Sequence, residues 1–105
     1  MPGLQAPFAY ALKSGTVANT ALAMGTSPFD FSAAELAAAD QMYVTADAYS
    51  ISYTLNGTTP TTAIGHILAA AANIIVSGNR NVNTFLMIRA TSDSATVTVS
   101  LLKYS

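Results

Sequence analysis

His66 is the single histidine of the chain and the first residue to consider for chemistry. It lies beside Gly65 and among Ile64, Ile67 and Leu68. Its imidazole could be a pH-responsive contact or a lone metal ligand. A metal site needs several converging ligands, and the chain has no second histidine and no cysteine. We therefore interpret His66 as a partly buried or interface-lining residue and predict no metal site.

The carboxylates and serines do not form a catalytic pattern either. Triad residues can come from distant positions, but no serine lies in a nucleophile-elbow context such as G-x-S-x-G. Glycoside hydrolysis requires two acids that flank a cleft, and no glycine spacing matches a phosphate-cradling loop. The acids fall in capping, turn or strand-end contexts (Asp30, Glu35, Asp40, Asp47 and Asp93). We predict that the protein is not an enzyme and uses no cofactor.

Charge is scarce along the whole chain. Only 9% of the 105 residues are charged, against about 25% in an average globular protein. An apolar fraction of 51% excludes disorder. The exterior must then be solvated by Ser, Thr and Asn, or covered by other subunits. With a net charge of −1, repulsion does little to keep copies apart, so we expect association.

The same composition restricts the partners and the location. A nucleic-acid footprint needs a basic stripe, whereas the four basic residues are scattered, so we predict no nucleic acid. The longest near-apolar run, 67–76, is shorter than the roughly 20 residues of a membrane span, so we predict no membrane. The start MPGLQAPFAY lacks a basic region followed by an apolar one. We therefore expect no secretory signal and synthesis in a cytoplasm.

The length fits one domain, in which residues 1–31 form an N-terminal arm or an extended segment and 32–105 the core. Phe8, Tyr10 and Leu12 alternate with smaller or polar residues, as in a strand with one apolar face. This segment either finds a groove on a neighbour or is the first strand of the same fold. The stretch 16–24 can form a second extended piece.

The middle of the chain combines one helix signal with strand signals. Ser32 and Glu35 have the spacing of a capping box, which predicts a short helix over about 33–39. Strands are predicted from Gln41, with Met42, Val44 and Ala46 on one face, and over 51–55. In the second strand Ser and Thr alternate with apolar residues, which predicts a half-buried strand.

Residues 63–77 carry two conflicting patterns. Apolar residues at helical spacing favour an amphipathic helix that ends near Gly78, whereas the β-branched run Ile74 to Val76 favours a strand. We favour strands near 65–68 and over 73–77, joined by an alanine turn. A turn is predicted over 77–81.

The last part of the chain is predicted to be β. A central strand is expected over 83–91 and a final strand over 97–101, and these two are predicted to pair as a hairpin. Short strands between regular turns indicate an all-β fold with one short helix, an antiparallel β-sandwich or a jelly-roll-like barrel.

The segment that follows the predicted strand over 51–55 forms a corner, and its sequence resembles motifs of known proteins. The stretch 53–61, YTLNGTTPT, resembles a Y-T-x-D-G-x-x-P-T corner in small β-sandwich modules attached to chitobiases and related carbohydrate enzymes. It is also similar to small tailed-bacteriophage proteins, encoded among head and structural genes, with a YTLDGTTPT core. The phage likeness covers about 31–104, including the Ala-rich helix and the closing Val/Thr strand. Asn56 replaces the frequent Asp, which keeps the turn and removes a charge.

The phage resemblance implies a non-enzymatic virion structural protein, in the first place a capsid decoration or cement protein on the capsid surface. It implies a homo-oligomer, with a trimer as the first expectation, and contact with the major capsid protein or other virion proteins. Alternatives are a tail, neck or head-fibre component, or a carbohydrate-binding or adhesion module, although the chain has no Trp for a sugar platform. The expected contact residues are Phe8, Tyr10 and Leu12, and the corner residues Asn56, Gly57, Thr58, Thr59 and Pro60.

Overall fold

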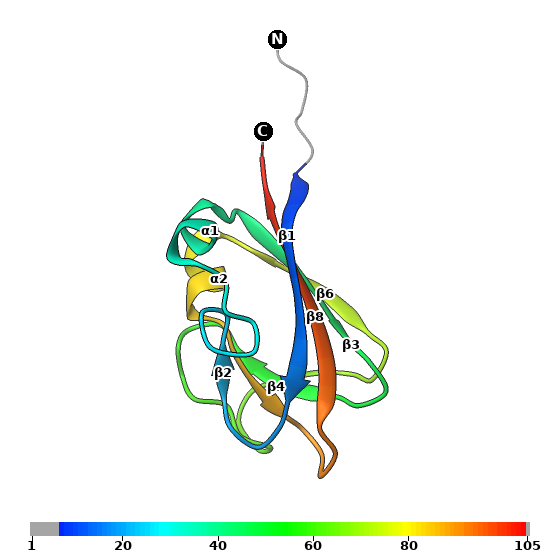
Figure 1. Cartoon of the computed structure of the whole chain (residues 1–105). Helices are drawn as coiled ribbons and strands as arrows, with labels where there is room; N and C mark the ends of the chain where they lie inside the picture. The colour runs from blue at the N-terminus through cyan, green and yellow to red at the C-terminus, as the bar shows by residue number, and fades with distance from the viewer. Residues whose placement is uncertain (1–6, 105) are drawn as a thin grey trace.

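The computed structural model describes residues 7–104, which form two four-stranded antiparallel sheets packed face to face (Figure 1). Sheet A has the order β1-β8-β3-β6 and sheet B the order β2-β7-β4-β5. The predicted all-β antiparallel sandwich is confirmed. The strands of sheet A are β1 (Phe8–Val17), β8 (Ala95–Lys103), β3 (Gln41–Ala46) and β6 (Asn73–Ser77). The strands of sheet B are β2 (Leu22–Ala23), β7 (Leu86–Arg89), β4 (Ile51–Thr54) and β5 (His66–Leu68).

The pairing is nested along the chain. Strand β1 pairs with β8, β2 with β7, β3 with β6 and β4 with β5. The chain thus resembles one long hairpin whose tip is the β4–β5 connection. Rolling this hairpin adds the β3–β8 and β4–β7 pairings and divides the strands between two sheets. This is the arrangement of a jelly roll.

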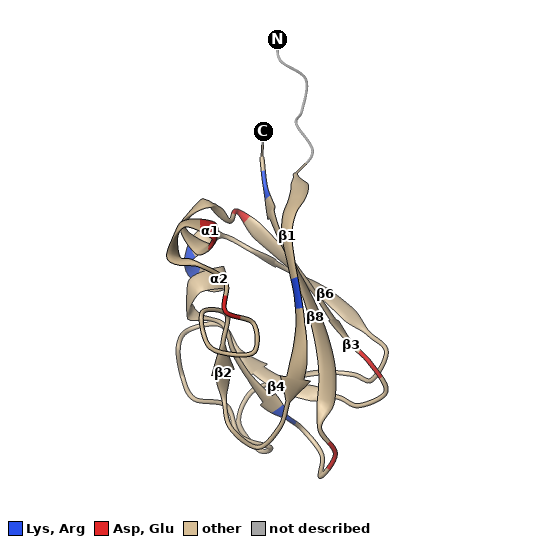
Figure 2. Cartoon of the chain, in the orientation of Figure 1, with Lys and Arg blue, Asp and Glu red and all other residues tan. Residues whose placement is uncertain are grey.

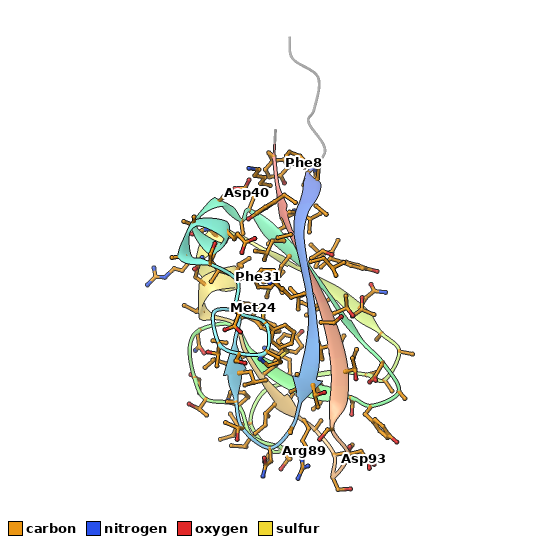
Figure 3. The ribbon with its side chains drawn as sticks, viewed as in Figure 1. Phe8, Met24, Phe31, Asp40, Arg89 and Asp93 are labelled. Atoms are coloured by element: carbon orange, nitrogen blue, oxygen red, sulfur yellow. The ribbon has the colours of Figure 1, made fainter. Side chains whose placement is uncertain are left out.

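The core lies between the sheets and follows the two-residue period of the strands. Met42, Val44 and Ala46 of β3 are buried, as the sequence predicts. Chain outside the sheets also contributes, because Met24, Phe29 and Phe31 of the β2–β3 connection are buried. In Figure 3 the labelled Met24 and Phe31 come from this connection, beside β1.

Two short helices, α1 (Ala33–Ala38) and α2 (Asn79–Thr84), contact each other at one end of the sandwich. The capping box of α1 is confirmed: the Glu35 amide donates to Ser32 Oγ at 3.1 Å, and the Ser32 amide donates to Glu35 Oε1 at 2.9 Å. Helix α2 was missed, because a turn was predicted over 77–81. Its N-cap residue Gly78 makes no side-chain cap.

Asparagine amides connect the two helices. Asn79 Nδ2 donates to the carbonyl oxygens of Leu36 and Ala39 at 2.9 and 2.7 Å, and Asn83 Nδ2 donates to that of Leu36 at 3.1 Å. Carbonyl oxygens at the end of a helix lack partners within it, and the asparagine amides add to the one backbone bond that the Leu36 carbonyl oxygen accepts from the Ala39 amide at 3.3 Å. Helix α2 therefore depends on a tertiary contact that local propensity does not reveal, since Asn is a poor helix former.

The conflict over residues 63–77 is resolved in favour of strands. Strand β5 spans His66–Leu68 and β6 spans Asn73–Ser77, with a turn between them. The predicted hairpin of the last two strands is wrong. Strand β7 pairs with β2 and β4 in sheet B, whereas β8 pairs with β1 and β3 in sheet A. The connection after Arg89 crosses between the sheets.

Residues 8–17 belong to sheet A, because β1 pairs with β8 along its length. The register shifts between Ala9 and Ala11, so the intervening Tyr10 lies in a β-bulge. Tyr10 and Ala11 both pack against the core, whereas Leu12 is 63% exposed. The prediction that Phe8, Tyr10 and Leu12 share one face is therefore wrong. Residues 1–6 and 105 lie outside the described residues. Within residues 7–104, no helix has the length and apolar character of a membrane span.

Candidate interaction site

The β4–β5 connection, residues 55–65, is called the corner loop here. It folds back over the outer face of β4 and covers two hydroxyls. Ser52 Oγ donates to the Ile64 carbonyl oxygen at 3.1 Å, and Thr54 Oγ1 donates to the carbonyl oxygen of Thr58. Ser52 is 1% exposed and Thr54 is 7% exposed. The prediction of a half-buried β4 is wrong, because both faces of this strand are covered.

Further hydroxyl and amide contacts fix the loop without charged groups. The Thr58 amide donates to Asn56 Oδ1 at 3.1 Å, which forms an Asx turn around Gly57. The Ile64 amide donates to Thr61 Oγ1 at 3.0 Å. Thr84 Oγ1, at the end of α2, donates to the carbonyl oxygen of Leu55. The corner loop is thus bonded to itself, to β4 and to α2.

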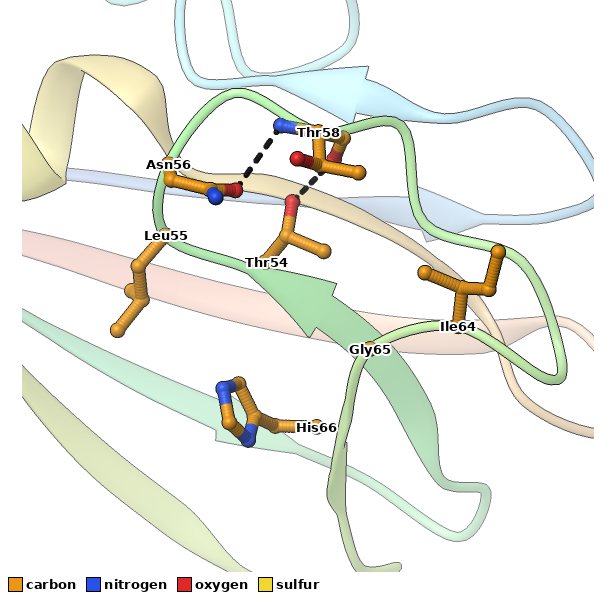
Figure 4. Close-up of a pocket in the computed structure, with 7 residues that line it drawn as sticks. All are labelled: Thr54, Leu55, Asn56, Thr58, Ile64, Gly65 and His66. Atoms are coloured by element: carbon orange, nitrogen blue, oxygen red, sulfur yellow. Dashed lines mark hydrogen bonds between the residues drawn. The ribbon is translucent and has the colours of Figure 1, made fainter.

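A hollow of about 400 Å³ opens beside the corner loop (Figure 4). The His66 ring lies at its wall, 5.4 Å from the Tyr53 ring, which stacks on the buried Phe85 at 5.4 Å. The hollow offers one imidazole, one amide and hydroxyls for binding, but no carboxylate partner for the imidazole. It is lined by Thr54, Leu55, Asn56, Thr58, Ile64, Gly65 and His66.

A second hollow, of about 590 Å³, lies between Thr61 and Thr62 of the corner loop and the end of β7. Its one charged group is the Arg89 guanidinium, which is surrounded by hydroxyls and an amide. Such a set can bind polar ligands but supplies no nucleophile with an activating base. It is lined by Asn19, Thr61, Thr62, Ile88, Arg89, Ala90, Thr91 and Ser92.

The outer face of sheet A is open, in contrast to the covered face of β4. One row of paired residues crosses all four strands, from Leu12 through Ser100 and Tyr43 to Ile75. Leu12, Tyr43 and Ile75 are 63%, 39% and 61% exposed. The flanking rows add only small, polar or apolar residues. They consist of Ser14, Thr98, Thr45 and Asn73 on one side and Ala9, Leu102, Gln41 and Ser77 on the other.

No charged side chain belongs to these rows in the described strands of sheet A. Figure 2 shows that the charges lie mainly in helices, connections and strand ends. Lys13 is the exception within a strand, but it lies opposite the buried Val99 and therefore on the inward side of the edge strand β1. These three rows of the outer face are therefore uncharged, with an apolar row at their centre. An exposed charge, Asp47, follows directly after β3, where its amide donates to the Thr96 carbonyl oxygen at 3.2 Å.

The predicted contact residues come from two different places. Phe8, Tyr10 and Leu12 belong to the edge strand β1 of sheet A, and the corner residues follow β4 of sheet B. Asn56, Gly57, Thr58 and Thr59 are exposed, whereas Pro60 is buried and cannot contact a partner as the loop stands. The reason is that the loop folds back over its own sheet.

Sequence reasoning did not identify Tyr43 and Ile75 as contact residues. A signal for Tyr43 was present, because it alternates with the core residues Met42 and Val44. Ile75 was hidden within the continuous apolar run of β6 and only the pairing of the sheet places it outside. The apolar row could not be recognised without the register.

Tyr10 gives a pH prediction. Burial raises the pKa of its phenol, and the nearby carboxylates Glu35 and Asp40 raise it further. Its hydroxyl donates to the carbonyl oxygen of Glu35. A raised pKa means that the folded protein holds the proton more tightly than the unfolded chain, so the free energy of unfolding falls as pH rises above about 10.

We expect Tyr10→Phe to reduce this alkaline loss of stability. Urea denaturation of both proteins at pH 8 and at pH 11 measures it, with Tyr49→Phe as the control at an exposed tyrosine. An equal alkaline loss in wild type and Tyr10→Phe would show that Tyr10 does not contribute.

Within residues 7–104, no group of His, Asp and Glu side chains is arranged to hold a metal ion. No protein-family model, curated protein or solved structure matches the chain.

Proposed function

We propose that this chain is a non-enzymatic structural protein of a phage particle, most specifically a capsid decoration protein that binds shell subunits and other copies of itself. The observation that carries the proposal is the uncharged outer face of sheet A, with its exposed row of Leu12, Tyr43 and Ile75. An exposed surface of this kind suits contact with protein, because few charges have to be desolvated. The resemblance of residues 31–104 to phage head proteins supports the same function.

Binding in this function is driven by burial of apolar surface. Each Å² of apolar surface removed from water contributes roughly 25 cal/mol before the costs of association. One outer face is small, so a single contact is weak. A copy that touches several shell subunits, or neighbours that are themselves bound, gains by multivalency. A trimer on a local three-fold axis, which the resemblance implies, would provide such multiple attachment.

The exposed part of the corner loop is the second proposed contact. Asn56 to Thr59 protrude from a loop that is fixed by internal hydrogen bonds. A loop ordered before binding loses little conformational entropy when a partner covers it. Its amide and hydroxyl groups would bond to the partner at the rim of an apolar contact.

The experiment compares two tyrosines of similar exposure. Tyr43 is 39% exposed on the outer face of sheet A, and Tyr49 is 41% exposed in the β3–β4 connection. Empty shells of the major capsid protein from the same phage are incubated with wild type, Tyr43→Lys or Tyr49→Lys. Bound protein is measured by sedimentation and electron microscopy. We expect Tyr43→Lys to lose at least about tenfold in affinity, since it places a charge in an apolar contact. Tyr49→Lys should bind like wild type.

Wild type that fails to bind any shell, or equal binding of all three proteins, would contradict the proposed function. The melting temperature of each variant serves as the control for folding. A glycan array on the same proteins tests the carbohydrate-binding alternative, for which the Arg89 hollow and exposed aromatics supply contacts. If the protein binds sugar and does not bind shells, the carbohydrate-binding function replaces our proposal.

A further inference from the structure

The edge strands of the two sheets differ in their protection against pairing with another chain. Natural edge strands are protected by shortness, charge, proline or a bulge. In sheet B, β2 has two residues and β5 has three. In sheet A, β1 carries the bulge at Tyr10 and the charge of Lys13. Three of the four described edges are therefore protected.

Strand β6 has none of these features. It spans five residues, its register with β3 is unbroken, and it contains neither charge nor proline. It is the edge strand of sheet A on the side opposite β1 (Figure 1). Asn73, Ile75 and Ser77 are exposed, with Ile75 at 61%. The backbone groups on its free side are available to an additional strand.

The sequence of β6 is complementary to itself in the antiparallel direction. When the strand is paired with a second copy about its central residue, Asn73 lies opposite Ser77, Ile74 opposite Val76, and Ile75 opposite Ile75. Polar residues thus meet polar residues and aliphatic residues meet aliphatic residues. Because β6 carries no charge, no like charges oppose each other along it.

We propose that β6 pairs antiparallel with β6 of a second copy, around a twofold axis at Ile75. Such a contact uses the same surface on both copies and closes on itself. The two A sheets become one continuous sheet. Their outer faces lie on the same side, so the rows of Leu12, Ser100, Tyr43 and Ile75 from both copies join end to end.

The size of this contact indicates how it is used. A five-residue strand is about 17 Å long, and pairing along it buries less than the roughly 1,200–2,000 Å² of a stable specific interface. The pair is therefore weak in solution. If copies are held side by side on a shell, as the proposed function states, the contact becomes effectively intramolecular and strengthens. It would then link neighbouring oligomers, including trimers.

Cysteine cross-linking tests the pairing on the purified protein, because the chain has no cysteine of its own. Directly opposed residues in an antiparallel pair have Cβ atoms about 4.5–5.5 Å apart, and a disulfide can close with little movement. Ile75→Cys should form a covalent dimer under mild oxidation. The control Ile67→Cys, at a residue that is 58% exposed on β5 of sheet B, should cross-link at least about tenfold more slowly, since only random collisions join it. Equal rates for the two variants would overturn the proposal.

Sedimentation equilibrium provides a second measurement that needs no oxidation. Ile75→Lys opposes two like charges across the axis and should weaken dimer formation at least about tenfold. Ile67→Lys, at a residue that is 58% exposed on β5 of sheet B, should leave it unchanged. Wild type that stays monomeric up to about 1 mM would also overturn the pairing. If the protein is monomeric but still binds shells, the β6 pairing is wrong and the proposed function stands. If β6 pairs but the protein does not bind shells, the pairing stands and the proposed function is wrong.

Discussion

Replacing Gly65 with alanine is expected to destabilise the protein by about 3 kcal/mol or more. Gly65 has a φ of +132°, in a region that side chains disfavour. A Cβ atom there would lie 2.9 Å from the carbonyl oxygen of Tyr53 and would collide with Ser52 Oγ. The hydroxyl that fixes the end of the corner loop would have to move, and β5 would lose its close approach to β4.

Gly57 provides the matched control in the same loop. Its φ is +83°, but no atom lies within 4 Å of an added Cβ. Gly57→Ala should therefore cost only about 1 kcal/mol, from the backbone conformation alone. Urea denaturation with a common m-value measures both variants, and about 1 kcal/mol corresponds to roughly 4–8 °C in melting temperature for a domain of this size. Equal losses for Gly57→Ala and Gly65→Ala would contradict the close packing.

The features that the sequence predicts correctly are those encoded locally. The capping box needs only Ser32 and Glu35 at the correct spacing, and its two hydrogen bonds form as expected. The alternation in β3 places Met42 and Val44 in the core. The β-branched run of β6 outweighs the helical spacing over residues 63–77, because three such residues lose rotamer freedom in a helix.

The errors concern contacts between distant segments. The Ser and Thr residues of β4 have the pattern of a solvated face, yet the corner loop covers Ser52 and Thr54 with partners from residues 58 and 64. Helix α2 depends on amide contacts with the end of α1, 40 or more residues earlier in the chain. The hairpin of the last two strands was predicted from adjacency in sequence, whereas β8 is placed by β1 and β3.

The candidate surfaces could be predicted only in part. The turn at Asn56 and Gly57 follows from residue types that tolerate its backbone geometry, and both residues are exposed. The burial of Pro60 depends on the path of the whole loop. The apolar row of sheet A depends on register across four strands, which no local pattern of Leu12, Tyr43 or Ile75 contains.

Hydroxyls and amides perform structural work in this protein that charged groups often perform elsewhere. Asn79 and Asn83 bond to the end of α1, and Thr84 connects α2 to the corner loop. Neutral groups of this kind hold the ends of the sandwich without placing charge on its faces. Because neutral side chains make these contacts, the sequence needs few charged residues, and the outer face of sheet A can remain uncharged.

Phe85→Ala is the second variant with a large expected effect, a loss of about 3–5 kcal/mol. Phe85 is fully buried, ends α2 and stacks on Tyr53 with ring centroids 5.4 Å apart. Its removal leaves a cavity between sheet B and α2, and it also removes an aromatic pair worth about 0.5–1.5 kcal/mol. Chemical denaturation measures the loss.

Phe8→Ala is the control for Phe85→Ala, because it removes the same type of side chain from a position that is 43% exposed, at the start of β1. Its contact with the Lys103 ammonium, 5.9 Å from the ring centroid, contributes about 0.5–1 kcal/mol at an exposed site. Phe8→Ala should therefore cost less than about 1 kcal/mol. A loss for Phe8→Ala as large as that for Phe85→Ala would mean that the β1–β8 end, and not the Tyr53–Phe85 stack, dominates the stability of the sandwich.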